Sequence, residues 1–172
     1  MENLKTSSLR NKAQTHKQRS SGFRCINCRA LIPDANRVIG TQHRDHCPLC
    51  LFSLHLDEDK PGDRKSRCFG AMRPIGMTFK NNCKEPMVVY ECVKCGKIHK
   101  NRCSADDSVH TIVDILRRSL VSGRFDSHLI QKKLQSAGVI LIGKEEVVDL
   151  LHSIFGIAHI PQKYVQEFEI TL

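Results

Sequence analysis

Apolar positions recur with a helical period only in the last third of the chain. Behind a capping Asp107 or Ser108, the residues up to Val121 present one apolar side, formed by Ile112, Val113, Ile115, Leu116 and Leu120. This pattern predicts a first helix. The same spacing predicts a second helix from Asp126 or Ser127 to Gly138.

A third helix is predicted over residues 144–155, with Gly156 ending it. Residues 139–142 predict a short buried strand or an extended link, and the alternating residues 168–172 predict a final strand. Residues 108–172 are therefore expected to form a small α-rich C-terminal subdomain.

Turn-forming residues dominate residues 23–107, where Pro33-Asp34, the run 60–63 and Asn81-Asn82 interrupt the chain. The one clear strand candidate is 87–91, and 38–40 is a second. Large core side chains are scarce, since Trp is absent and aromatic residues make up 5% of the chain. The predicted fold class is therefore α+β: a small, loop-rich, zinc-ribbon-like domain held by metal rather than by a large apolar core, followed by the helical subdomain.

Residues 1–22 form a polar, basic arm with a single acid, Glu2. Such a segment buries too little apolar surface to offset its ordering entropy, so we expect it to be disordered by itself and to order on phosphate backbones. A mitochondrial presequence is the rival interpretation, which the lack of an apolar helical face disfavours.

The nine cysteines all lie within residues 23–107 and include three Cys-x-x-Cys pairs. Each such turn can direct two thiolates at one Zn²⁺, which prefers four tetrahedral ligands. The simplest assignment is two sites, the first with Cys25, Cys28, Cys47 and Cys50, the second with His55, Cys68, Cys92 and Cys95. An interleaved arrangement, or one site plus free cysteines, also fits the spacing. Cys83 and Cys103 are left out, and closed four-ligand sites predict a structural role for the zinc.

The chain contains no apolar run of the ~18 residues that cross a bilayer, and its first residues do not form a signal peptide. We therefore expect a reducing, cytoplasmic location, where cysteines favour metal over disulfides. Residues 1–108 hold 20 Lys and Arg against 11 Asp and Glu, whereas residues 109–172 hold seven of each. A basic front portion without a membrane signal favours a nucleic-acid partner.

The block Arg44-Asp45-His46-Cys47-Pro48, followed by Leu49-Cys50, resembles the signature of the RNHCP domain family of zinc-finger-like proteins. The resemblance continues through the Pro-Gly-Asp-Arg turn at 61–64, Cys68, the Gly-x-Met-x-Pro-Ile run at 70–75, Cys92 to Gly96, Asn101-Arg102 and Asp106-Asp107. It covers residues 22–107. Asp45 stands where the family motif has Asn, which weakens any role of that amide. The resemblance implies a zinc-binding module and no particular activity.

We expect a zinc-stabilised RNA-binding protein, associated with rRNA or ribosomes. The candidate phosphate contacts are the cationic residues Lys12, Lys17, Arg19, Arg24, Arg44, Arg64, Lys65, Arg67, Arg73, Lys97, Lys100 and Arg102. Few aromatic residues lie among them, so recognition of the RNA backbone and shape is favoured over base stacking.

Two alternatives stay open. His43-x-Asp45-His46, with His99 and Asn101, loosely resembles an HNH-like metal-dependent nuclease with a His general base, although Cys47 directly after His46 leaves little room for a second metal. The chain can also be a protein-interaction adaptor acting through residues 108–172. The sequence leans against an enzyme.

Overall fold

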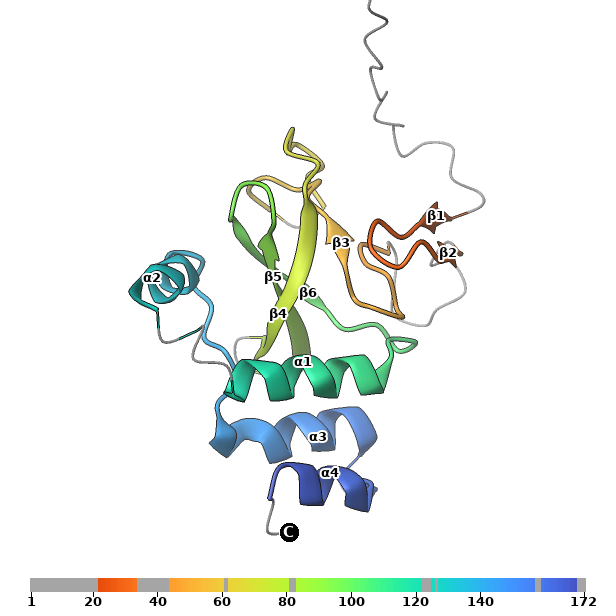
Figure 1. Ribbon diagram of the computed structural model, residues 1–172, viewed down its shortest axis with the longest axis vertical. Coiled ribbons are helices and arrows are strands. Elements are labelled where there is room, and N and C mark those ends of the chain that lie inside the picture. The colour runs from red at the N-terminus through yellow and green to blue at the C-terminus, as the bar shows by residue number, and fades with distance from the viewer. Residues whose placement is uncertain are drawn as a thin grey trace, which may run out of the picture.

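The computed structural model describes residues 22–33, 44–60, 62–80, 83–121, 125, 127–156 and 159–169. Within these residues, a curved sheet stands above a layer of helices, and a small ribbon lies to one side of the sheet (Figure 1). The prediction of an α+β fold is confirmed. The predicted strand at 38–40, the N-terminal arm up to residue 21 and the tail 170–172 lie outside the described residues.

The main sheet is antiparallel throughout, with the order β3-β4-β5-β6. Its strands are β3 (Ser53–Leu54), β4 (Ala71–Phe79), β5 (Pro86–Cys92) and β6 (Ile98–Arg102). The predicted strand at 87–91 is the centre of β5, and Tyr90 in it faces Pro74 on one side and His99 on the other. Short turns thus bring residues from three strands into one row.

The longest strand, β4, was not predicted, because Pro74 and Gly76 break its apolar pattern. The structure shows how both are tolerated. β3 pairs with β4 only at Ala71 and Met72, so the missing N–H of Pro74 faces no neighbouring strand. A register shift between Pro74 and Gly76 places a β-bulge at that point.

One face of the sheet packs against α1 (Val109–Val121) and α3 (Val147–Phe155), and α4 (Gln162–Glu167) adds Tyr164 to the same core cluster. Figure 1 shows these helices stacked as layers beneath the sheet. Sheet residues such as Met77 and Val88 share one core cluster with Leu116 and Leu150, all four fully buried. The expectation that metal replaces a large apolar core is therefore wrong, because aliphatic side chains and methionines supply the core that aromatic residues do not.

The opposite face of the sheet is covered by α2 (His128–Ser136). Ile130 and Leu134 of this helix pack with Val89 and Ile98. Residues 139–142 then run as an extended link beside the end of β4, where Ile142 N–H bonds to Met77 O at 2.9 Å. Of the two conformations considered for this segment, the structure shows the extended link.

The predicted helices match α1, α2 and the combination of a 3-10 turn (Lys144–Glu146) with α3. Ser108 caps α1 through its hydroxyl, which accepts Thr111 N–H at 3.3 Å. The predicted final strand is wrong where the chain is described, because Phe168 and Glu169 form a turn that ends α4. None of the described helices has the length and apolarity needed to span a membrane.

Candidate metal centres

The three Cys-x-x-Cys turns share one backbone geometry. In each, the N–H of the first cysteine bonds to the carbonyl five residues later: Cys25 to Ala30 at 2.9 Å, Cys47 to Phe52 at 3.0 Å and Cys92 to Lys97 at 2.9 Å. The residue four positions after this first cysteine donates its own N–H to the carbonyl of the cysteine. That residue has a positive φ in all three turns: 65° at Arg29, 59° at Leu51 and 73° at Gly96. We call these turns knuckles. Their folding aims both sulfurs of a pair to the same side.

The first centre joins the knuckles at 25–28 and 47–50. Cys25, Cys28, Cys47 and Cys50 place their sulfurs within 4.8 Å of one another. Cys25 Sγ lies 3.5 Å from Cys50 Sγ, and Cys28 Sγ lies 3.6 Å from Cys47 Sγ. A Zn²⁺ tetrahedron with Zn–S bonds of ~2.3 Å has sulfur–sulfur edges of ~3.8 Å. The four thiols therefore fit one zinc ion.

The ribbon of β1 (Phe23–Arg24) and β2 (Leu31–Ile32) supports this first centre. Cys25 and Cys47 are buried beside Ile32 in a small cluster of their own, separate from the core beneath the sheet. Burial raises the pKa of Cys47 to about 12, whereas the backbone N–H of Ala30 is the main cause that lowers the pKa of Cys28 to about 7. A buried thiolate is stable only beside a cation. The four sulfurs converge on one point, where a zinc ion can supply that positive charge.

The second centre lies on the sheet. His55 follows β3, Cys68 comes from the loop before β4, and Cys92 and Cys95 belong to the knuckle between β5 and β6. Cys68 Sγ lies 3.6 Å from Cys92 Sγ, and His55 Nδ1 lies 3.4 Å from Cys95 Sγ. The ligand atoms again lie within 4.8 Å of one another, so this group also fits one zinc ion.

Local hydrogen bonds adjust the thiols of the second centre in opposite directions. Burial raises the pKa of Cys92, but the backbone N–H groups of Cys95 and Lys94 outweigh it and bring the value to about 7. Burial raises the pKa of Cys95 to about 11, with the neighbouring thiols of Cys92 and Cys68 adding to the increase. The thiol of Cys92 therefore ionises more readily than that of Cys95, and metal binding favours the thiolate form of both.

The prediction of two zinc ions is confirmed in that the structure holds two groups, each able to bind one ion. The ligand sets are sequential along the chain and not interleaved, and they bring together the eight side chains assigned from the sequence. Cys83 is exposed and Cys103 packs against the main core, and neither belongs to a group. Burial raises the pKa of Cys103 to about 12.

The residues before the second knuckle are held by buried polar contacts. His46 Nε2 lies 2.9 Å from both oxygens of Asp107, and Arg44 Nη2 donates to Asp106 at 2.5 Å. The Arg44 side chain is 2% exposed, so the prediction that Arg44 contacts phosphate is wrong: burial and the Asp106 carboxylate remove its guanidinium from solvent. His46 is equally enclosed, which removes it as the solvent-exposed general base of the nuclease alternative. His43 lies outside the described residues.

A loop with many internal hydrogen bonds connects two ligands of the second centre, His55 and Cys68. Asp63 accepts backbone N–H bonds from Glu58, Asp59, Lys60 and Lys65 at 2.9 to 3.1 Å. Asp57 accepts from Gly62 N–H at 2.7 Å and Arg64 N–H at 3.0 Å. We call residues 57–67 the basic loop, because Lys60, Lys65 and Arg67 are exposed along it and form no ion pair within the described chain.

The other predicted phosphate contacts differ in availability. Lys12, Lys17 and Arg19 lie outside the described residues. Four cations are partly exposed but paired with carboxylates: Arg64 with Asp45, Arg73 with Glu91, Lys97 with Glu58 and Arg102 with Glu85. Arg24 is exposed and donates to Arg29 O at 2.9 Å, and the half-buried Lys100 lies 3.4 Å from Gly138 O.

The sequence interpretation missed cations that the fold adds to this surface. Helix α2 lies beside the third knuckle, where Lys133 Nζ approaches Gly96 and pairs with Glu91 at 3.1 Å. Lys132 of the same helix is exposed. The zero net charge of residues 109–172 concealed these two residues, because acids elsewhere in that segment cancel them; the adjacent Lys-Lys pair on a short helix was the available signal.

Comparison with known proteins adds one finding. A family model described as the RNHCP domain matches residues 20–113, which is more than half of the chain and includes both ligand sets. No curated protein matches the chain. No solved structure matches it either.

Proposed function

Since the chain belongs to the RNHCP domain family and holds two cysteine-rich metal-binding groups, we propose that it is a cytoplasmic RNA-binding protein whose zinc-ribbon-like centres are structural. All four ligands of each group come from the protein, so a bound zinc ion has no open position for a substrate or water. Zinc at such a site contributes to folding free energy and presents surface residues. Ribosomal RNA is the proposed partner.

The observation that supports RNA binding most directly is the basic loop. Six backbone N–H groups donate to the carboxylates of Asp57 and Asp63 and hold the loop in one conformation. Its exposed Lys60, Lys65 and Arg67 form no ion pair with a carboxylate in the described part of the chain. Preordered cations lose less conformational entropy when they bind phosphate than flexible ones do. Lysines of the third knuckle and of α2 extend the cationic surface beyond the loop.

Fluorescence anisotropy with a labelled hairpin RNA tests this proposal on the zinc-loaded full chain. The affinity should fall steeply with salt, with a log–log slope that decreases by ~0.9 for each phosphate contact removed. The double variant Lys65→Glu/Arg67→Glu should lose about tenfold or more in affinity at low salt.

Lys144→Glu is the matched control, because Lys144 is exposed on the 3-10 turn that precedes α3. Helix α3 lies in the helical layer beneath the sheet (Figure 1). An equal loss in this control would contradict a local interface. Absence of binding at ~50 mM salt would contradict RNA binding altogether. Cosedimentation of the wild type, but not of the double variant, with ribosomes would identify the proposed class of RNA.

A second candidate function rests on a groove between α2 and the third knuckle. This groove has a volume of about 440 Å³, and its lining includes the apolar Ile98 and Leu129 together with Lys97, Lys132 and Lys133. Leu129 is 66% exposed and therefore offers apolar surface beside the lysines. A protein partner with an acidic, partly apolar segment fits this combination. The uncharged substitution Leu129→Gln should weaken such binding and leave the affinity for hairpin RNA unchanged.

A further inference from the structure

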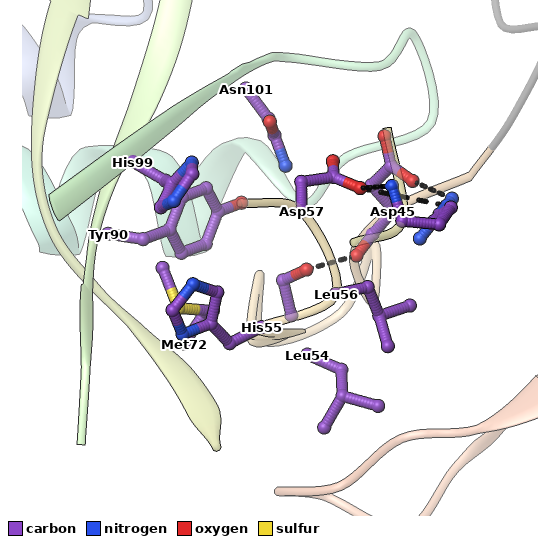
Figure 2. A pocket seen from close by; sticks show the side chains of 11 residues that line it. Asp45, Leu54, His55, Leu56, Asp57, Met72, Tyr90, His99 and Asn101 are labelled. Carbon is purple, nitrogen blue, oxygen red and sulfur yellow. Dashed lines mark hydrogen bonds and ion pairs between the residues drawn. The ribbon is translucent and has the colours of Figure 1, made fainter. Parts of the chain in front are cut away.

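A small polar pocket lies beside the second metal centre (Figure 2). Three of its polar side chains come from the loops around β3: Asp45, Asp57 and Arg64. Three others, Tyr90, His99 and Asn101, come from β5 and β6. Figure 2 shows the Tyr90 hydroxyl and the Asn101 amide turned toward the space beside Asp57. The pocket shares His55 with the second metal centre and shares Asp57 and Arg64 with the basic loop, but none of the loop's exposed cations Lys60, Lys65 and Arg67 lines it.

The pocket contains buried polar atoms without a hydrogen-bond partner. Tyr90 is 0% exposed, and its Oη has no partner among the described residues. The same holds for His99 Nε2 and for His55 Nε2. Because Nδ1 of His55 faces the metal centre, its Nε2 carries the remaining N–H. Native proteins pair almost all such atoms, so the pocket is prepared for a polar occupant.

The charge of the pocket selects the kind of occupant. Asp45 and Asp57 contribute two negative charges, and Arg64, which is paired with both, contributes one positive charge. The second metal centre beside it, with three thiolates, adds further negative charge when it holds zinc. A phosphate group is therefore excluded, and a group with N–H donors is favoured.

The size of the pocket restricts the occupant further. Its volume of about 20 Å³ exceeds the ~10–15 Å³ that one water molecule needs, and it has no room for a whole ligand. A chelated metal ion does not fit either, because the described Asp and His side chains here form no group of three with converging ligand atoms. Leu54, 36% exposed, and Leu56 also line the pocket and offer an apolar surface to the rest of a ligand.

We propose that this pocket binds the exocyclic amino group of an unpaired nucleobase, which rests on the proposed RNA binding. An amino group is water-sized, donates N–H bonds, and in cytosine and adenine lies next to a ring nitrogen that accepts. Asp57 and the amide oxygen of Asn101 accept from the amino group, and the Tyr90 hydroxyl donates to the ring nitrogen. The base itself lies over Leu54 and Leu56, and nearby cations of the basic loop hold its phosphates.

Two oligonucleotides that differ by one amino group test the pocket. The first is an eight-nucleotide oligouridine with one central cytidine, and the second carries a pyrimidin-2-one nucleoside, cytidine without its amino group, at that position. The zinc-loaded full chain should bind the cytidine oligonucleotide about tenfold more tightly in fluorescence anisotropy. Asn101→Leu should reduce this preference toward onefold and leave the affinity for the second oligonucleotide unchanged. Tyr90→Phe should weaken the binding of both oligonucleotides by a similar factor, because both contain the ring nitrogen to which the Tyr90 hydroxyl donates.

Both variants must still hold two zinc ions per chain, and Tyr90→Phe keeps the aromatic ring that packs in the core. Equal binding of the two oligonucleotides by the wild type would overturn the pocket while the proposed RNA binding stands, and would leave an amino group of a protein partner as the occupant to examine. A preference that persists in Asn101→Leu, or an unchanged affinity for both oligonucleotides in Tyr90→Phe, would also overturn it. If neither oligonucleotide nor the hairpin RNA binds, the proposed function and this inference fail together.

Discussion

His46 Nε2 lies 2.9 Å from both carboxylate oxygens of Asp107, and both residues are buried. Next to this pair, Arg44 binds Asp106. The first block of the family motif and its terminal Asp-Asp are therefore joined residue by residue, across about 60 positions of sequence. These contacts attach the second knuckle to the start of α1, where Ser108 N–H also bonds to Pro48 O at 2.8 Å. The Arg, His and Asp residues of the motif thus have a structural role.

Breaking the His46–Asp107 contact should destabilise the fold. Asp107→Ala leaves His46 Nε2 buried without a partner and also removes the acceptor of Ser104 N–H, so we expect a loss of about 1–3 kcal/mol in the free energy of unfolding. Urea denaturation of His46→Ala, Asp107→Ala and the double variant measures the coupling. A double variant that loses the sum of the two single losses would show that the contact contributes nothing.

Gly70 lies against the sulfurs of the second centre. A Cβ atom at this position would come within 2.6 Å of Cys92 Sγ and 3.3 Å of Cys68 Sγ, both of which are held in place by the metal geometry. Gly70→Ala should therefore reduce the zinc content from two ions per chain to one, as measured by elemental analysis. In the control Gly76→Ala, the new methyl group meets only the movable side-chain ends of Leu141 and the Ser119 Cβ, so both ions should stay. Two ions in Gly70→Ala would contradict the described ligand geometry.

The nine thiols should react in three classes. With zinc bound, the seven ligand thiols are protected, and Cys83 is exposed and outside both groups. Burial raises the pKa of Cys103 to about 12, so at about pH 8 this residue has almost no thiolate. Iodoacetamide should label one cysteine per native chain, none in Cys83→Ser, and all nine after denaturation with a chelator. Rapid labelling of a second site in the native protein would disagree with this assignment.

The Asp63 carboxylate should order the basic loop equally at all pH values near neutrality. Backbone N–H bonds, that of Glu58 first, hold the pKa of Asp63 well below its usual range. A lowered folded-state pKa stabilises the loop above the unfolded value of ~3.9 and loses this effect only as the pH falls through the folded value. Asp63→Asn should therefore increase amide hydrogen exchange at Glu58, Asp59 and Lys60 by the same factor at about pH 6 and about pH 8.

Asp59→Asn is the control for that experiment, because the exposed Asp59 side chain accepts no bond from the loop in the described structure. An effect of Asp63→Asn that changes between the two pH values would mean that the carboxylate titrates in this range. The result would then contradict the lowered pKa and the hydrogen-bond pattern that causes it.

The metal ligands and helices could be predicted because their signals are local. Cys-x-x-Cys spacing, capping serines and terminating glycines each act within a few residues. Of the three knuckles, only the last has a glycine, Gly96, at the left-handed position; Arg29 and Leu51 adopt the same conformation without a glycine signal. The shared geometry of the knuckles therefore became visible only in the structure.

Long-range features could not be predicted in the same way. Strand β6 has the sequence Ile98-His99-Lys100-Asn101-Arg102, which lacks an apolar alternation because one side lines a polar pocket. Arg44 resembled a free cation, because Asp106 lies 62 positions away in sequence. The pocket around Tyr90 depends on pairing between strands, and no single segment contains its pattern.

All ligands of the first metal centre precede those of the second along the chain. A nascent polypeptide can therefore capture its first ion once Cys50 has been synthesised, before β4 to β6 exist, whereas the second centre must wait for Cys95 and for the strand pairing that positions it. Vectorial synthesis thus imposes an order of metallation, and the two ions never compete for a shared cysteine during biogenesis.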